Sequence, residues 1–213
     1  MAVIQTQQGE RELTRLWFQS EVWYSVLLST NPNEGALPAN PDHHAAFYAE
    51  QQVLPGNGYP GALGPYSFSE PVWNAGQSRY DQSIADQSFT ASGGDVSFQA
   101  YALVRGHKGL PPQPTTLSSN TFTTTAHGLS SGDLVVIVSD GGSLPSGYTS
   151  GLTYRVDNAT ANTFTIENFD GSSVSLSGGS SLYVTPVNGA WAVYEDFDAV
   201  QTVADGQTQN IGL

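Results

Sequence analysis

One stretch of the chain, Asp95 to Val104, constrains the fold more than any other. Its side chains alternate with a period of two, which is the period of a β-strand and not of a helix. A Gly93-Gly94 turn separates it from strand-like residues around Phe89, and this pair predicts a hairpin. The apolar residues of one face are Val96, Phe98, Ala100, Ala102 and Val104.

Shorter stretches of the same kind lie toward both ends of the chain. Val22 to Leu28 alternates with a period of two, and Ala190 to Tyr194 predicts a further strand. Val200 to Leu213 contains an Asp205-Gly206 turn and predicts a closing hairpin. We therefore expect an all-β body, a β-sandwich of jelly-roll-like type.

A long passage rich in Pro, Gly and Asn, residues 30–64, separates the first strand from the rest of the body. It predicts one short helix, Asp42 to Glu50, with Asp42 as the N-cap. A connection of this length in a compact domain is usually functional.

The amino-acid composition changes after Lys108 to Pro114, a segment that we interpret as a stiff, proline-rich linker. The residues that follow are dominated by Ser, Thr and Gly, with short strands between turn signals, which is typical of a small barrel or sandwich. The expected strands lie near 121–125, 134–138, 153–157, 163–167 and 182–185. The predicted division is an N-terminal arm (1–20), a body (21–110 and 187–213) and an inserted small β-domain (111–186).

Charge excludes some classes of partner. Six Lys and Arg oppose 19 Asp and Glu, for a formal net charge of −13, so the surface repels phosphate backbones and anionic membranes. We therefore expect no nucleic-acid partner and no membrane partner. No window approaches 18 apolar residues, and the N-terminus lacks the pattern of a signal peptide.

The motifs that could indicate a cofactor or a metal have simpler interpretations. Gly56 to Gly61 matches the dinucleotide-binding pattern G-x-G-x-x-G, but Pro60 interrupts it and strand-like residues, not a helix, follow. His43 and His44 lie beside Asp42 without a third or fourth ligand nearby in the sequence. Asp140, Asp157 and Asp170 lie at turns outside any EF-hand pattern. We expect no cofactor and no metal.

The sequence also favours a protein that is not an enzyme. There is no cysteine and no G-x-S-x-G nucleophile motif. The densest acidic groups, Glu195-Asp196-Phe197-Asp198 and the pair Asp42 and Glu50, fit a solvated rim or an intersubunit contact better than paired catalytic carboxylates. No catalytic residue is therefore assigned.

Two segments resemble phage structural proteins. The run from His127 to Val135, followed by Thr153-Tyr154-Arg155-Val156 and Asn162 to Ile166, is similar to a small β-barrel module of phage head and tail proteins. The flanking Val22-Trp23-Tyr24 and Phe98-Gln99-Ala100-Tyr101 resemble capsid-decoration and tail-accessory sandwiches.

The resemblance implies a virion component that is commonly trimeric. We expect a capsid decoration or cement protein, made in the host cytoplasm and located on the capsid surface, with the major capsid protein and further copies of itself as partners. The alternative is a tail or fibre accessory protein whose inserted domain binds host-surface glycans.

Contact residues are expected in the arm and in the long passage. The arm presents apolar side chains on too few residues to bury them internally, and such a patch normally marks an interface. The expected interface residues are Leu13, Leu16, Trp17, Phe18, Phe47 and Tyr48.

A pair of double variants tests the arm. Changing Trp17 and Phe18 to Ala should weaken assembly or shell binding, because an aromatic anchor at the centre of an interface can contribute ~2 kcal/mol or more. Changing Glu195 and Asp196 to Gln and Asn should do little, since exposed ion pairs contribute well under ~1 kcal/mol. Shell occupancy of the two variants is the measurement, and an essential acidic pair with a dispensable aromatic pair would contradict the prediction.

Overall fold

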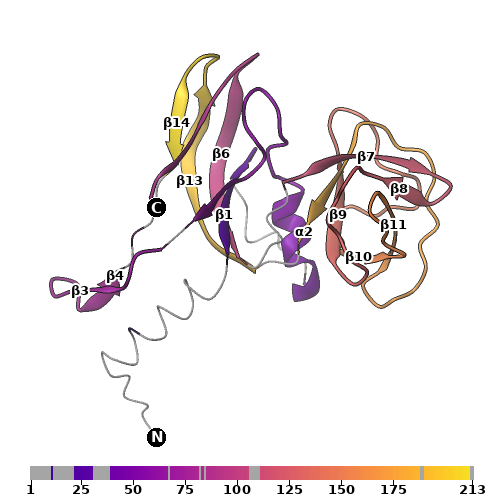
Figure 1. Cartoon of the computed structure of the whole chain (residues 1–213), viewed down its shortest axis with the longest axis horizontal. Coiled ribbons are helices and arrows are strands. Elements are labelled where there is room, and N and C mark those ends of the chain that lie inside the picture. The colour runs from indigo at the N-terminus through magenta and orange to yellow at the C-terminus, as the bar shows by residue number, and fades with distance from the viewer. Residues whose placement is uncertain are drawn as a thin grey trace, which may run out of the picture.

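The computed structural model describes residues 11, 22–30, 39–66, 68–81, 83, 85–105, 111–187 and 190–211. The described chain forms a body of packed β-sheets and a closed β-barrel beside it, with one short helix between them (Figure 1). The expected all-β fold with a small inserted barrel is therefore confirmed.

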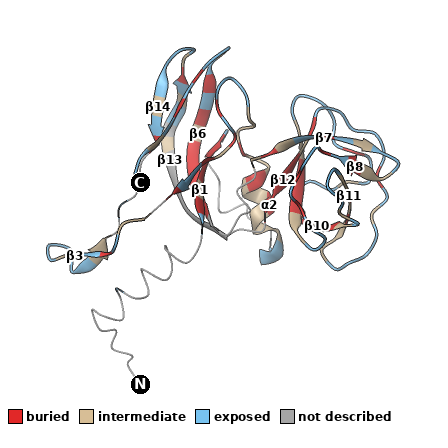
Figure 2. Ribbon diagram, in the orientation of Figure 1, coloured by how far each residue is buried: buried red, intermediate tan, exposed pale blue. Residues whose placement is uncertain are grey.

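The larger sheet of the body has four antiparallel strands in the order β13-β6-β1-β2. They are β1 (Trp23–Leu28), β2 (Leu63–Tyr66), β6 (Val96–Arg105) and β13 (Ala190–Val203). The long alternating stretch of the sequence is β6, which lies between β1 and β13. Most of β1 and β6 is buried (Figure 2), so this sheet is covered on both faces.

A second sheet of two strands, β5 (Gln87–Thr90) and β14 (Thr208–Ile211), covers one face of the first. The two predicted hairpins are therefore wrong, because β5 and β14 pair with each other, and neither pairs with the strand next to it in sequence. The turns at Gly93-Gly94 and Asp205-Gly206 each carry the chain from one sheet to the other. The core between the sheets contains Leu27, Tyr59, Leu63, Phe89, Ala91, Val96, Phe98, Tyr101, Val203 and Ile211.

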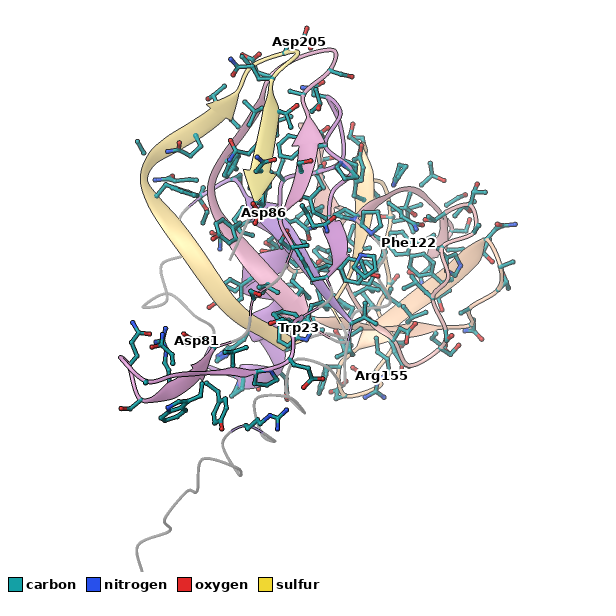
Figure 3. The ribbon with its side chains drawn as sticks, turned by 60° about the vertical axis from the view of Figure 1, so that its left-hand side comes forward. Trp23, Asp81, Asp86, Phe122, Arg155 and Asp205 are labelled. Atoms are coloured by element: carbon teal, nitrogen blue, oxygen red, sulfur yellow. The ribbon has the colours of Figure 1, made fainter. Side chains whose placement is uncertain are left out.

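A small hairpin projects from the body between β2 and β5. It consists of β3 (Val72–Asn74) and β4 (Arg79–Asp81), which pair with each other and with no other described strand. Figure 3 shows Asp81 on this hairpin, away from the packed sheets. We call residues 69–83 the projecting hairpin; hydrogen bonds from the Ser69 and Ser83 backbone N–H groups close its base.

The other face of the large sheet is covered by the chain between β1 and β2. This segment contains a 3-10 turn, η2 (Pro41–His43), and the helix α2 (His44–Ala49), as the sequence predicted. The expected cap is wrong: Asn40 accepts the backbone N–H of Asp42 at 3.1 Å and is the N-cap of η2, whereas the N-cap of α2 is His43. Tyr48 packs against the sheet residues Val26, Leu28, Ala100, Ala102 and Val104.

The inserted unit is a closed barrel with the strand order β10-β11-β8-β7-β12-β9. Its strands are β7 (Gln113–Ser118), β8 (Thr121–Thr123), β9 (Leu134–Ser139), β10 (Tyr154–Asp157), β11 (Thr163–Asn168) and β12 (Leu182–Pro186). Five match the expected strands. The linker interpretation fails at its end, because Gln113 and Pro114 pair with Val184 and Tyr183.

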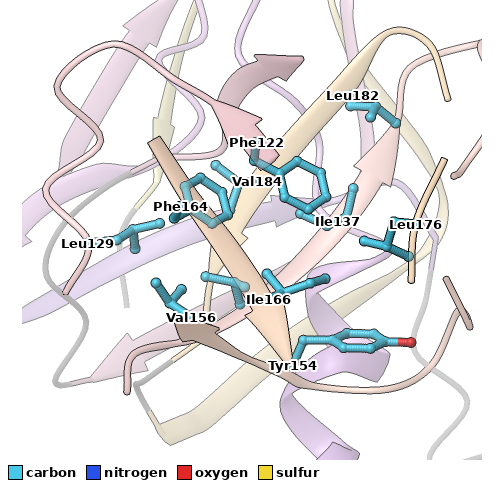
Figure 4. Packing of buried hydrophobic residues seen from close by; sticks show 11 residues of the cluster. Phe122, Leu129, Ile137, Tyr154, Val156, Phe164, Ile166, Leu176, Leu182 and Val184 are labelled. Atoms are coloured by element: carbon cyan, nitrogen blue, oxygen red, sulfur yellow. The ribbon is translucent and has the colours of Figure 1, made fainter. Parts of the chain in front are cut away.

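The barrel has a core of its own, in which the Phe122 and Phe164 rings stack with centroids 5.2 Å apart (Figure 4). His127 packs edge-on against Phe164, and its Nδ1 accepts the Leu129 N–H at 3.0 Å, as expected for a histidine in a turn. The buried members are Phe122, Leu129, Val135, Ile137, Tyr154, Val156, Phe164, Ile166, Leu176, Leu182 and Val184.

The nested arrangement predicts that the body folds without the barrel. Arg105 at the end of β6 pairs with Ala190 at the start of β13, so the barrel interrupts two neighbouring strands. Replacing residues 110–187 by a short Gly/Ser linker that joins Gly109 to Asn188 should leave a β-rich protein that melts cooperatively. Its melting temperature should be lower than that of the intact chain, because α2 loses its cover. Loss of a cooperative transition in circular dichroism would contradict this prediction.

Candidate functional site

Only some of the residues expected at an interface lie in the part of the chain that the structure describes. Of the expected interface residues, Leu13, Leu16, Trp17 and Phe18 lie outside the described residues. Phe47 and Tyr48 are described, lie on α2 and are half-buried, with their rings edge to face at 5.3 Å. Their contact with another protein stays a prediction.

The helix α2 joins the two β units through an apolar contact. Ala46 and Ala49 are buried against Val136 and Val187 of the barrel unit. The two alanines are three positions apart and so lie on one side of the helix, where their small side chains allow close approach. Val136 points outward from the barrel while its neighbours Val135 and Ile137 point into the barrel core.

Polar contacts surround this apolar patch. The Glu50 carboxylate accepts the Gly151 backbone N–H at 2.6 Å and the Ser150 hydroxyl at 2.8 Å. His43 Nδ1 accepts the Thr153 N–H at 3.1 Å. Hydrogen bonds to a carboxylate are roughly twice as strong as neutral ones.

This junction fixes the barrel relative to the body. An apolar patch alone would allow α2 to slide on β9, whereas Glu50 and His43 accept from defined N–H groups of one barrel segment. Of the two acidic residues that the sequence analysis grouped here, Asp42 is exposed, whereas the Glu50 carboxylate accepts hydrogen bonds from the barrel.

The glycine-rich motif at 56–61 forms a packed loop of the sandwich. The Tyr59 hydroxyl is buried, accepts the Leu27 N–H at 3.0 Å and donates to the Gly61 carbonyl at 2.9 Å. Burial raises the pKa of this hydroxyl well above its ordinary value. Gly58 has φ of +81°, and a Cβ there would collide with the Thr90 carbonyl oxygen. The glycines thus allow close packing, and β2 follows the loop instead of a helix.

The other described acidic and histidine residues do not form a cluster of the size a metal ion needs. In the part of the chain that the structure describes, no three His, Asp or Glu side chains gather closely enough to hold a metal ion. Asp170 accepts the Ser172 N–H and hydroxyl within a turn, and these bonds lower its pKa. Asp157 accepts the Asn158 amide at 2.6 Å. These carboxylates stabilise turns.

The projecting hairpin carries partly exposed apolar side chains and was missed by the sequence analysis. Trp73 and Tyr80 are directly opposite in the ladder, and their rings meet edge to face at 5.2 Å. Val72, on the other face, is 67% exposed. The signal in the sequence was an aromatic residue on each side of the turn-forming run Asn74 to Ser78.

A polar network holds the turn of this hairpin. Asn74 Oδ1 accepts the N–H groups of Gly76 and Gln77, and Asn74 Nδ2 donates to Asp81 at 2.7 Å. Arg79 forms an ion pair with the same carboxylate at 2.7 Å. The Asn74 hydrogen bond, followed by that from Arg79, holds the pKa of Asp81 below its ordinary value. The network therefore stabilises the hairpin above the ordinary pKa of an aspartate, and this stabilisation is lost as the pH falls through the lowered value.

Comparisons with known proteins found no matching family model, no matching curated protein and no matching solved structure. Among the helices that the structure describes, none is long and apolar enough to span a membrane.

Loosening the junction is a direct test of its role. Changing Glu50 to Ala should leave both β units folded while the barrel gains motion relative to the body, because two hydrogen bonds to the carboxylate are lost. Rotational correlation times of the two units from NMR relaxation should diverge in this variant. The control is Asp140→Asn, which neutralises an exposed carboxylate of the barrel that forms no hydrogen bond or ion pair with the described residues of α2. Equal correlation times in the Glu50→Ala protein would refute the role.

Proposed function

We propose that this protein is a structural, non-enzymatic component of a bacteriophage particle that decorates the capsid and stabilises it by protein–protein contacts. Its location is the capsid surface, after synthesis in the host cytoplasm. Its partners are the major capsid protein and further copies of itself, in a trimer. The proposal starts from the resemblance of the barrel segment and the flanking strands to phage structural proteins.

The observation that carries the proposal is the junction between the two β units. A cement protein must hold its contact surfaces at fixed spacing, because each bridges points on a shell whose geometry is set by the shell itself. The α2 contact, with Glu50 and His43 bonded to the barrel, supplies such a fixed spacing. Pre-organised contact surfaces lose less conformational freedom on binding.

The composition of the surface supports the same function. Charged residues make up 12% of the chain, against about 25% in ordinary soluble domains. Short neutral side chains such as Ser and Thr lose little entropy when a partner covers them. A surface of this kind suits extensive, permanent contact.

The alternative function, glycan binding by the inserted domain of a tail or fibre accessory protein, has weaker support. An open cleft does lie between the units, lined by residues such as Gln52, Asn57 and Asp95 of the body and Asp140 of the barrel. Its lining includes no aromatic ring among the described residues, and sugar rings stack preferentially on aromatic faces.

Imaging of purified particles tests the proposal. With a small tag on the chain, cryo-electron microscopy of the particles should show additional density at many equivalent positions over the whole shell. A shell stripped of the protein should lose resistance to heat or chelation and recover it when the recombinant chain is added back. Density confined to one vertex or to the tail would instead favour the accessory function, and absence from the particle would refute both.

A further inference from the structure

We propose that the projecting hairpin is the element with which one copy of this chain holds a second copy. This inference rests on the proposed function, which includes self-association, and adds the segment that performs it. Three features of the hairpin support this role: it is incomplete alone, its strands and turn carry no net charge, and hydrogen bonds hold its turn rigid.

Within the part of the chain that the structure describes, no third strand pairs with the hairpin. An isolated hairpin is at best marginally stable in water, and a third strand or a packed face is usually required. Among the described residues, β3 and β4 pair only with each other, and the ring contacts of Trp73 and Tyr80 are with each other. The exposed side chain of Val72 adds apolar surface on the opposite face. A docked partner would supply the missing cover.

Charge selects a second copy as that partner. The chain carries −13, so two copies repel each other wherever their acidic surfaces meet. Residues 71–81, the strands and turn of the hairpin, contain one Arg and one Asp, which form an ion pair, so this part has no net charge. At its base Arg11 lies 3.8 Å from Glu70 and balances that carboxylate too.

The remaining described surface contrasts with the hairpin. Residues 111–187 contain five acidic residues and one Arg, so the barrel is negative. At the far end of the sandwich, Asp95 and Asp205 are exposed. A basic partner would bind to these acidic surfaces. The neutral, aromatic hairpin would not repel a second copy of this negatively charged chain, so it suits contact between copies.

The geometry of the hairpin favours tight binding. Trp and Tyr are the residues most enriched among those that dominate binding energy at interfaces. The Asn74 network fixes the turn before any partner arrives, so little backbone entropy is lost when the rings are covered.

The test is the oligomeric state of the full chain in solution. Size-exclusion chromatography with light scattering at tens of micromolar should show an oligomer for the wild type. The Trp73→Ala/Tyr80→Ala variant should shift toward monomer, with a rise in dissociation constant on the order of tenfold or more. The matched control is Tyr183→Ala, which removes a half-buried aromatic side chain from barrel strand β12 and should leave the oligomer unchanged.

A second variant distinguishes loss of the oligomer from loss of folding. Because Ser69 and Ser83 are hydrogen-bonded, residues 70–82 can be replaced by a short Gly/Ser turn without separating the ends of the body. This variant should still melt in one cooperative transition, which shows that the body is folded, and it should be monomeric.

Cross-linking locates the contact directly. The chain has no cysteine, so Ser78→Cys places a single thiol at the exposed turn of the hairpin. A photoactivatable linker on this thiol, in a mixture of isotopically light and heavy copies, should give mixed peptides that join the two copies.

The outcomes separate this inference from the proposed function. A monomeric wild type, or hairpin variants that remain oligomeric, would overturn the inference while particle imaging still decides on decoration. Hairpin variants that remain oligomeric but lose shell occupancy would assign the hairpin to the capsid and equally overturn it. Monomeric hairpin variants, together with cross-links between two copies of the Ser78→Cys protein, would support it even if the protein proved to belong to the tail.

Discussion

The packing of α2 between the two β units is the interaction on which the arrangement of the molecule depends. The helix has only six residues and is too short to be stable alone, so it exists because both sides of it are covered. Tyr48 packs on the large sheet, and Ala46 and Ala49 pack on the barrel. The passage between β1 and β2 thus contributes the helix that connects the two β units.

Local patterns in the sequence were sufficient to find most strands and insufficient to pair them. The barrel strands β8 to β12 were predictable because turn residues bound each of them. The strand β7 was missed because Pro112 and Pro114 are typical of a linker, although an exposed Pro114 is compatible with strand pairing. The turns at Gly93-Gly94 and Asp205-Gly206 fit a hairpin and a crossing between sheets equally well, and the choice depends on the distant pairing of β5 with β14.

For the contact surfaces too, the sequence indicated some of the residues but not their distant partners. Glu50 and His43 were noticed as a candidate acid and a candidate ligand, but their partners at Gly151 and Thr153 lie about a hundred residues away, and no local pattern announces them. The continuous apolar run in β9 was a usable signal, since a strand that is apolar on both faces must be covered on both. The arm residues expected at an interface, Leu13, Leu16, Trp17 and Phe18, lie outside the described residues, and their role stays a prediction.

The position of the barrel within the chain also affects how the body can fold. Strands β6 and β13 pair across the whole inserted unit, which gives this sheet contacts of very large sequence separation, and such contacts slow folding. The barrel receives the chain at β7 and releases it at the adjacent strand β12. Once the barrel has folded, its two ends are held side by side, and the loop that the body must close shrinks to the short connections at either side. A barrel that folds first therefore lowers the entropic cost of pairing β6 with β13.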